Sequence, residues 1–393
     1  MKDRVAVGLS GGVTSAVAAA LLKQQGFDVV GVHLQVVPSG KSGLVSLFGS
    51  HCVKTSSEQI AKKFCEQNDI PYYLVDVGDI FLNEVVDHFT HESLQARKPS
   101  PCVVCNSKIK LGCLAAKADE LGIDKIATGH RAQIVPDPES GFPHIYQSVD
   151  KVRDRSHFLY EADPEILKRT MMPMGSFTAS LIEKLAIELG LVSLGVDLTA
   201  QSPGEPCFVS DPFYIPFVEK RSVASLRMSG VVKNVKREPI GEHKGLFTFL
   251  IGQDVTELYQ DRRKLEEKLY VAGFDRVEKS VIIGEERFLH SREAFLRKMR
   301  WLQKPDNIKG LKCRARMSSP DKGEVDCTVT SLEGSSAHVE FTEVVRAVGA
   351  GSFVVFYRGE ELLGGGTVDR VVNVQTVMPT KEEESAKEQK EAT

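Results

Sequence analysis

Residues 5–16 carry the residue types needed to hold a phosphate. An apolar run at 5–7 leads into Ser10-Gly11-Gly12, and a helical pattern begins near Ser15. Glycines let the backbone approach an anion closely, and the free amides at a helix N-terminus then bind it. No Gly-Lys-Ser/Thr follows, so this is not a Walker loop. The pattern predicts a nucleotide-binding strand–turn–helix, the alternative being a tight turn that only packs a helix on a strand.

Two cysteines lie three residues apart in Pro101-Cys102-Val103-Val104-Cys105, where a loop enters a helix. The pair is half of a zinc site, a redox pair or two structural thiols. No second Cys-x2-Cys and no paired histidines complete a zinc site, so we predict no metal centre. A helix N-terminus lowers the pKa of a thiol and favours the thiolate.

Cys207 stands alone in a second loop, GEPCFVSD, after a Pro/Gly/Ser break at 202–206. A lone cysteine is either inert or reactive, and the sequence leaves this open. The other cysteines are expected to be structural: Cys52, Cys65, Cys113, Cys313 and Cys327. Their scattered spacing indicates a reducing cytoplasm.

The first half alternates expected strands with helices, which implies a parallel sheet covered on both faces. Strands are expected at 5–7, 29–36, 72–77 and 125–127, and helices at 15–25, 57–68, 80–95 and 106–121. Ligands bind at the carboxyl ends of such strands, so the 8–15 loop and Gly129 are expected to share one edge. His130 either faces the nucleotide or packs at the strand end.

The second half is organised differently. A helix at 178–190 is ended by Gly190, and segments shorten beyond 211. Runs at 324–331, 337–341 and 353–357, separated by turns, predict a small β-barrel. Residues 380–393 are charged and almost free of apolar residues, so we expect a disordered tail.

Charge is distributed unevenly along the 393 residues, whose formal net charge is −3. Residues 292–316 hold nine Lys/Arg against Glu293 and Asp306, and 220–237 hold a smaller excess. Each cluster is either a solvated face or a footprint for RNA phosphates. No apolar run is long enough to span a bilayer and the N-terminus has no room for a signal peptide, so we expect a cytoplasmic protein with no membrane partner.

The order of several short blocks resembles the tRNA-specific 2-thiouridylases of the MnmA type, from residue 4 to about 372. The matching stretches are GLSGGVTSAVAAALLKQQGFDVVGV, PCVVCNSKIKLG, IATGH, DKVRDRSHFLY, MPMGSFT, PCFVSD, GEHKGLFTFLIGQ and VVFYRGEELLGGG. The resemblance implies an α/β PP-loop ATP-pyrophosphatase domain with a doubly wound sheet (1–210), a small central domain (211–285), a C-terminal β-barrel (286–379) and the tail (380–393).

The resemblance also implies a reaction. ATP, carrying Mg²⁺, adenylates the C2 oxygen of the wobble uracil of tRNA. A persulfide on Cys207, loaded by a sulfur-donor protein, then supplies sulfur, and Cys105 releases it by attacking Cys207. The implied ATP site comprises Gly8, Leu9, Ser10, Gly11, Gly12, Val13, Thr14, Ser15, Leu34 and Gly129. The implied contacts to the target base are Ser100, Pro101 and Cys102, and those to the rest of the tRNA are Arg153, Asp154, Arg155, Arg314 and Ala315.

The chain departs from the family pattern at several positions. Thr14 replaces the Asp of the phosphate loop, Ile60 a second Asp, Ala179 a Lys and Arg155 a Gln, and Asp254-Val255-Thr256 replaces a segment with Arg and Gly. A hydroxyl is a weaker ligand for Mg²⁺ than a carboxylate. Two hypotheses follow, an active 2-thiouridylase and a paralogue that binds tRNA or carries sulfur without adenylation. A different PP-loop chemistry, such as amidation of a small molecule, would need neither cysteine nor barrel.

Overall fold

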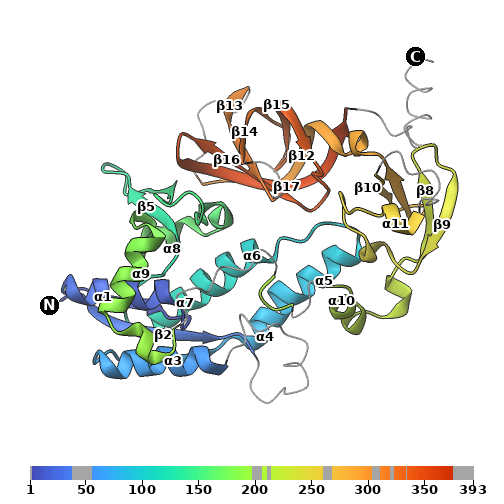
Figure 1. Ribbon diagram of the computed structural model, residues 1–393. Coiled ribbons are helices and arrows are strands. Elements are labelled where there is room, and N and C mark those ends of the chain that lie inside the picture. The colour runs from blue at the N-terminus through green and yellow to red at the C-terminus, as the bar shows by residue number, and fades with distance from the viewer. Residues whose placement is uncertain are drawn as a thin grey trace.

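The computed structural model describes residues 2–37, 55–196, 206–209, 214–259, 268–302, 310–318, 323–332 and 334–374. Within these residues lie three β-sheets, with most helices around the first sheet and the barrel above it (Figure 1). The expected tail at 380–393 falls outside the described residues. None of the helices in the described segments has the length and apolar character that crossing a membrane requires.

The first sheet has five parallel strands in the order β3-β2-β1-β4-β7. Their bounds are β1 Arg4–Gly8, β2 Asp28–Gln35, β3 Tyr72–Asp76, β4 Lys125–Ala127 and β7 Thr170–Met171. Val5 and Val7 pack into one apolar cluster and Ala6 into another, so the sheet is buried on both faces. The predicted doubly wound α/β fold is confirmed.

Helices cover both faces of this sheet and extend away from it toward the other two sheets (Figure 1). The α-helices are α1 Val13–Gln24, α3 Thr55–Gln67, α4 Gly78–Phe81, α5 Asp87–Leu94, α6 Pro101–Val104, α7 Leu114–Glu120, α8 Pro164–Lys168 and α9 Ala179–Glu188. π-Helical stretches at Leu82–Val86 and Cys105–Cys113 join α4 to α5 and α6 to α7. Single 3₁₀ turns lie at Ser156–Leu159, Pro173–Ser176 and Leu191–Leu194. Gly190 is left-handed at φ 67° and follows α9, as predicted.

The C-terminal strands close into a six-stranded antiparallel barrel, because β12 pairs with both β15 and β17. The strands are β12 His290–Trp301, β13 Leu311–Met317, β14 Glu324–Ser331, β15 Ala337–Arg346, β16 Phe353–Arg358 and β17 Glu361–Asn373. Alternate residues such as Ala315, Val339 and Phe356 fill its interior. The predicted barrel is confirmed. It also contains β12, which precedes in sequence all of the strand runs predicted for the barrel.

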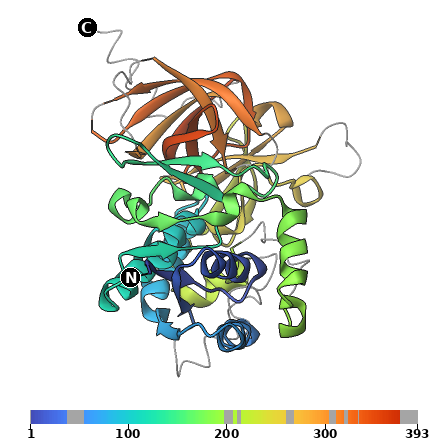
Figure 2. The same ribbon diagram turned by 90° about the vertical axis from the view of Figure 1, so that its left-hand side faces the viewer.

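A hairpin from the first half of the chain joins the barrel sheet. Strands β5 Ala132–Pro136 and β6 Pro143–Gln147 pair with each other, and Ile145 of β6 pairs with Leu362 of β17. Figure 2 shows this hairpin lying beneath the barrel. The sequence analysis did not predict these strands, because the strand they pair with lies more than half the chain away.

The third sheet lies between the others in sequence and beside the barrel in space (Figure 1). Its strands are β8 Gly230–Asn234, β9 Pro239–His243, β10 Tyr270–Asp275 and β11 Ser280–Gly284, in the order β10-β11-β8-β9. The accompanying helices are α10 Ile215–Arg221 and α11 Thr256–Tyr259, with 3₁₀ turns at Ala224–Leu226, Leu246–Thr248 and Glu286–Leu289. The boundaries at 210 and 285 stay predictions.

Candidate active site

The glycine loop lies where the strand order of the first sheet reverses. The chain runs from β1 outward through β2 to β3, then crosses to β4 on the other side of β1. Such a switch point is where open α/β sheets bind ligands. Gly8, Leu34 and Gly129 stand at or just beyond the carboxyl ends of β1, β2 and β4, so the structure gathers these predicted residues at one edge.

The loop presents free amides to this edge. Gly12 precedes α1 without any side-chain cap, and the first turn of α1 contains no acidic residue. The Ser15 hydroxyl donates to the Gly12 carbonyl at 2.9 Å and accepts from the Ser10 amide at 3.2 Å, which fixes the curve of the loop. An uncapped helix start of this kind binds anions.

Two glycines allow the loop to be packed tightly. Gly11 is left-handed at φ +75°, and a Cβ there would lie 2.3 Å from the Ser57 carbonyl oxygen of α3. A Cβ on Gly129 would lie 2.6 Å from the Ser15 amide nitrogen. Any side chain at either position would push α3 or β4 away from the loop.

His33 is a loop-supporting residue that sequence reasoning missed. Its Nδ1 lies 2.8 Å from the Leu9 carbonyl oxygen, and burial lowers its pKa, so the neutral ring donates to that carbonyl. The only sequence feature that could have identified His33 is its position next to Leu34, near the end of a predicted buried strand.

Thr14 and Ile60 stand where the resemblance implies carboxylates, and they leave the loop without an acidic side chain at those positions. Thr14 is half-buried in the first turn of α1, and among the residues described here its hydroxyl has no hydrogen bond. Ile60 packs against the apolar cluster that contains Val5, Val17 and Phe64. Ile60 therefore contributes packing where a carboxylate would contribute charge.

Cys102 and Cys105 lie on one continuous helical stretch that begins at Pro101 and ends at Glu120. Burial raises the pKa of Cys105 to about 11, partly offset by Lys110. Burial also raises the pKa of Cys102, against the charges of Lys110 and Arg155. Loss of hydration is the largest contribution to both shifts, and their direction is opposite to the lowering expected for a thiol at a helix N-terminus.

A hydrogen-bond chain connects these cysteines to the nucleotide edge. His130 Nε2 lies 2.7 Å from Asn106 Oδ1, and Asn106 Nδ2 donates to the Cys102 carbonyl at 2.8 Å. His130 Nδ1 lies 2.8 Å from the Thr128 hydroxyl. Burial lowers the pKa of His130 to about 3, so the ring is neutral, donating to Asn106 and accepting from Thr128. These bonds tie His130, just after β4, to the helical stretch that carries Cys102 and Cys105, and a role facing the nucleotide stays a prediction.

Cys207 lies in the described stretch 206–209 and packs against the same apolar cluster as Cys105 and Cys113. Its neighbour Phe208 is buried in that cluster against Phe81 and Phe89. Cys207 is disulfide-bonded, whereas Cys102 and Cys105 are free, so this bond is not the Cys105–Cys207 disulfide of the implied reaction. Cys313 and Cys327, also free, face each other across β13 and β14 with their Sγ atoms 3.6 Å apart.

The segment that precedes the cysteines borders a cavity of about 500 Å³. Ser100, Val103 and Val104 form one wall, and Arg297 and Thr367 of the barrel form another. Ser100 therefore opens toward the barrel, whereas Pro101 is buried and Cys102 is half-buried. The predicted base-contacting residues lie at the junction of the first sheet's helices and the barrel.

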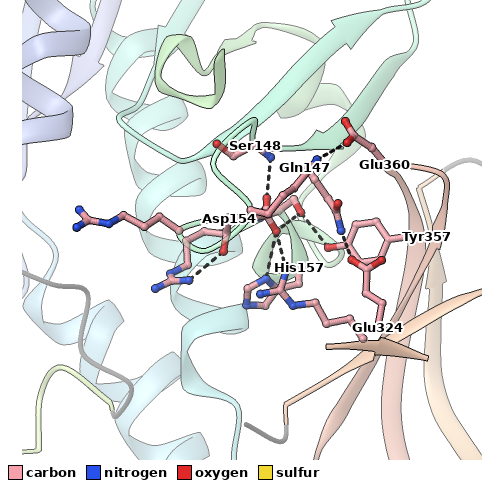
Figure 3. A network of polar contacts seen from close by, with 12 residues as sticks. Gln147, Ser148, Asp154, His157, Glu324, Tyr357 and Glu360 are labelled. Carbon is pink, nitrogen blue, oxygen red and sulfur yellow. Dashed lines mark hydrogen bonds and ion pairs between the residues drawn. The ribbon is translucent and has the colours of Figure 1, made fainter. Parts of the chain in front are cut away.

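The predicted tRNA-contacting residues do not share one environment. Arg153 is exposed and Arg155 is half-buried, whereas the Asp154 side chain is only 1% exposed. Asp154 Oδ1 accepts from the Ser148 amide at 2.8 Å, and Oδ2 accepts from the Ser156 hydroxyl at 2.9 Å and from Arg316 at 2.8 Å. Direct contact between this carboxylate and tRNA is incompatible with the arrangement, because its oxygens are already bonded and buried (Figure 3).

The Asp154 network joins the first unit to the barrel. Ser156 also bonds Tyr357 of β16 at 2.9 Å, and Gln147 donates to Glu324 of β14 (Figure 3). Burial alone would raise the pKa of Asp154, but hydrogen bonds and the charge of Arg316 outweigh it and lower the pKa. Asp154 is thus an ionised anchor between the segment that carries Arg153 and Arg155 and the barrel.

The basic cluster at 292–316 is partly neutralised inside the molecule. Arg314 pairs with Glu324 at 2.9 Å and keeps 42% of its side chain exposed. Arg316 pairs with Asp154, and Arg297 lies 3.7 Å from both Glu92 and Asp369. Ala315 is fully buried in the barrel, so its side chain cannot meet tRNA. Of the predicted barrel contacts, Arg314 alone has an available side chain.

We expect Asp154→Ala to destabilise the protein by about 3–5 kcal/mol, because it leaves Arg316 without its buried partner. Asp154→Asn will cost less at neutral pH. The folded-state pKa of Asp154 lies below its ordinary value of 3.8, so this stability is present above that pH and is lost as the pH falls through the lower value. Urea unfolding of wild type and Asp154→Asn between pH 7 and pH 3 measures this. A constant difference across that range would contradict an ionised anchor.

The switch-point glycine loop and the closed barrel define a two-part class of protein. The family described as "tRNA methyl transferase HUP domain" matches residues 3–211, and the "Aminomethyltransferase beta-barrel domain" matches residues 291–368. The tRNA-specific 2-thiouridylase MnmA of Desulfitobacterium hafniense is 32% identical over 381 residues, covering 93% of this chain and 98% of that protein. The MnmA of Geotalea uraniireducens is 34% identical over 386 residues, covering 96% and 98%. The chain belongs to the tRNA-specific 2-thiouridylase family, as its resemblance predicted.

Proposed function

We propose that this protein is an ATP-dependent 2-thiouridylase that acts on the wobble uridine of tRNA. The observation that carries this proposal is the placement of Cys105 and Cys207, far apart in sequence, against one apolar cluster. Cys105 lies on the same helical stretch as Val103 and Val104, which border the cavity. A protein that only bound tRNA would need neither thiol.

The proposed reaction begins at the uracil C2 oxygen, which is a poor leaving group. The oxygen attacks the α-phosphate of ATP, pyrophosphate leaves, and AMP becomes the leaving group. The terminal sulfur of a Cys207 persulfide then attacks C2 and AMP departs. Cys105 attacks Cys207 Sγ, so the sulfur stays on the base and a Cys105–Cys207 disulfide forms. An external dithiol must reduce that disulfide before the next turnover.

The loop residues fit ATP but not a protein-held Mg²⁺. The uncapped start of α1 after Gly12 supplies amides for phosphates, and Gly11 and Gly129 let the neighbouring backbone pack closely against the loop that presents them. Thr14 and Ile60 supply no carboxylate, and a hydroxyl alone is a poor magnesium site. Among the described residues no cluster of His, Cys, Asp or Glu could hold a metal ion. We therefore assign no step to a metal held by these residues.

The proposed tRNA site lies between the segment at 153–155 and the barrel. Arg153 and Arg155 flank the Asp154 anchor. Asp154 binds Arg316 of β13, and Arg314 lies on the same strand. A wobble base turned out of its stack could then reach the Ser100 wall of the cavity while these arginines hold phosphates. The persulfide comes from a separate sulfur-donor protein in this proposal.

The function is tested with purified protein, a tRNA transcript bearing a wobble uridine, ATP and a persulfide-loaded carrier protein. Nucleoside mass spectrometry should find 2-thiouridine only when all components are present. A matched transcript with cytidine at the wobble position should gain no sulfur. Absence of 2-thiouridine with fully reduced protein would contradict the proposal.

The second candidate is a paralogue that binds tRNA or carries sulfur without adenylation. The loss of both carboxylates at Thr14 and Ile60 favours it. Such a protein would bind tRNA and accept a persulfide, yet release no pyrophosphate when tRNA and ATP are supplied. Pyrophosphate release therefore separates the two candidates.

Replacing Arg314 with Gln should weaken tRNA binding and reduce the log–log salt slope by about one unit per lost phosphate contact. Fluorescence anisotropy across salt concentrations measures this. Arg287→Gln is the matched control, because Arg287 is exposed, pairs with Glu285 and lies outside the basic cluster. An unchanged slope for Arg314→Gln would identify the cluster as a solvated face.

A further inference from the structure

The short connection from α5 to α6 leads directly into Ser100, Cys102 and Cys105, and contacts from both other sheets hold it in place. We propose that Arg97 in this connection is a positioning residue. Through Glu92 and Asp369 it holds the cysteine segment in register with the barrel, so the barrel sets the geometry of the cysteines as well as binding tRNA. The catalytic part of this inference rests on the proposed function.

Arg97 lies at the centre of a small charged cluster between α5 and the barrel. Its Nε lies 3.0 Å from Glu92 Oε2, with the two side chains 11% and 12% exposed. Its Nη2 lies 3.6 Å from Asp369 Oδ1 and donates to the Val368 carbonyl at 3.4 Å, both on β17. Arg297 of β12 approaches the same two carboxylates at 3.7 Å. Arg97 therefore bridges the helix before the cysteines to β17, and Arg297 ties β12 to the same two carboxylates.

The backbone beside Arg97 is bonded to the barrel as well. The Lys98 amide donates to the Ala350 carbonyl at 2.8 Å, and its ammonium group donates to the Ser318 carbonyl at 3.0 Å. Gly351 is left-handed at φ +89°, and a Cβ there would lie 2.7 Å from Lys98 N and O. The barrel reaches this close only because position 351 has no side chain.

The third sheet holds the other end of the connection. Arg276 Nε, just after β10, donates to the Gln95 carbonyl at 2.8 Å. Ala96 packs into the apolar cluster of that sheet, with Val232, Leu246 and Phe249. Ala96 is left-handed at φ 51°, a conformation that costs free energy in a residue with a Cβ. Local sequence does not favour this bend, so the surrounding contacts must maintain it.

A buried ion pair adds little net stability compared with apolar packing, although removing one partner is costly. What it does supply is a fixed geometry for the groups it joins. Here it fixes a connection that has no regular structure and that ends at the residues predicted to contact the base. A displacement of about 1 Å at a reacting group can cost about 10²-fold in rate.

The test compares Arg97→Met with Arg169→Met. The control breaks the pair between Arg169, the residue after α8, and Asp119, which lies at the opposite end of the helical stretch from Cys102 and Cys105; Arg169 Nη2 and Asp119 Oδ2 are 2.9 Å apart. Arg97→Met should lower the thiolation kcat 10- to 100-fold while tRNA Kd changes less than twofold. It should also raise the alkylation rate of Cys105 at least fivefold and speed amide exchange across residues 95–105. Asp369→Asn, at a half-exposed position, should show the same pattern more weakly.

Equal losses of kcat and tRNA affinity, or unchanged Cys105 alkylation and exchange, would overturn the assignment of Arg97. The alkylation and exchange measurements need no catalysis. If the wild type forms no 2-thiouridine, the proposed function fails, and these two measurements still decide whether Arg97 positions the cysteine segment.

Discussion

Cys105→Ser and Cys207→Ser will each abolish 2-thiouridine formation, whereas Cys113→Ser will leave it near the wild-type rate. Each of the first two changes removes one of the sulfurs that must form the proposed disulfide. Cys113 is the matched control, because it lies on the same helical stretch and the same apolar cluster as Cys105. Burial raises the pKa of Cys113 as it does that of Cys105. The two thiols therefore have similar environments and differ mainly in their position along the helical stretch.

The two inactive variants should differ in the sulfur they retain. Cys105→Ser should still accept a persulfide on Cys207, whereas Cys207→Ser should accept none at either position. Mass spectrometry after incubation with the persulfide-loaded carrier reads this directly. Because Cys207 is disulfide-bonded in this structure, the protein must be reduced first. Normal thiolation by Cys207→Ser would show that the carrier assignment is wrong.

The raised pKa of Cys105 gives the same prediction a pH dependence. With a pKa of about 11, Cys105 is a neutral thiol at pH 7 to 8, and its alkylation rate should keep rising as the pH approaches that value. Binding of tRNA that admits water or a cation to the site should shift this profile to lower pH. A profile with a midpoint near 8.5, the value of a free thiol, would show that burial does not control this cysteine.

Thr14→Asp will raise the rate of tRNA-dependent pyrophosphate release if the protein is an enzyme with a slow first step. Charge shifts onto the departing pyrophosphate in the transition state, and loss of one electrostatic contact of this kind costs about 10²–10³ in rate. Thr14 is half-buried in the first turn of α1, where an added carboxylate could hold Mg·ATP without disturbing the core. Thr14→Ser, which keeps a hydroxyl, is the control and should behave like wild type.

Two other results have distinct meanings. If adenylation has been lost, the Thr14→Asp variant will release no pyrophosphate, because Ile60 and Ala179 still depart from the family pattern. That result favours the paralogue. If wild type turns over rapidly and Thr14→Asp slows it, the loop has been rebuilt around a hydroxyl, and Thr14 does not mark impaired chemistry. Pyrophosphate release with and without tRNA, measured for the three proteins side by side, distinguishes these cases.

The sequence by itself determined the elements whose signals are local. Three features depend on neighbouring residue types: the glycine-rich turn at residues 8–15, the alternation that makes a buried parallel sheet, and the left-handed Gly190 after α9. The family also followed from the order of short blocks, because that order survives at about one-third identity. The strands at 324–331 and 353–357 could be predicted because an alternating or apolar pattern is a local signal that extends over only a few residues.

Only the tertiary structure decided which of these residues meet and in what electrical environment. The family resemblance implied that Asp154 contacts tRNA, yet Arg316, Ser148 and Ser156 bond its carboxylate inside the protein. The hairpin β5–β6 and the Arg97 cluster depend on β17, which pairs with them across more than half of the chain. The sequence placed Cys105 where a loop enters a helix, a position that favours a lowered thiol pKa, but burial in the folded protein raises its pKa. Hydration and long-range pairing depend on the whole fold, and no local pattern of residues records them.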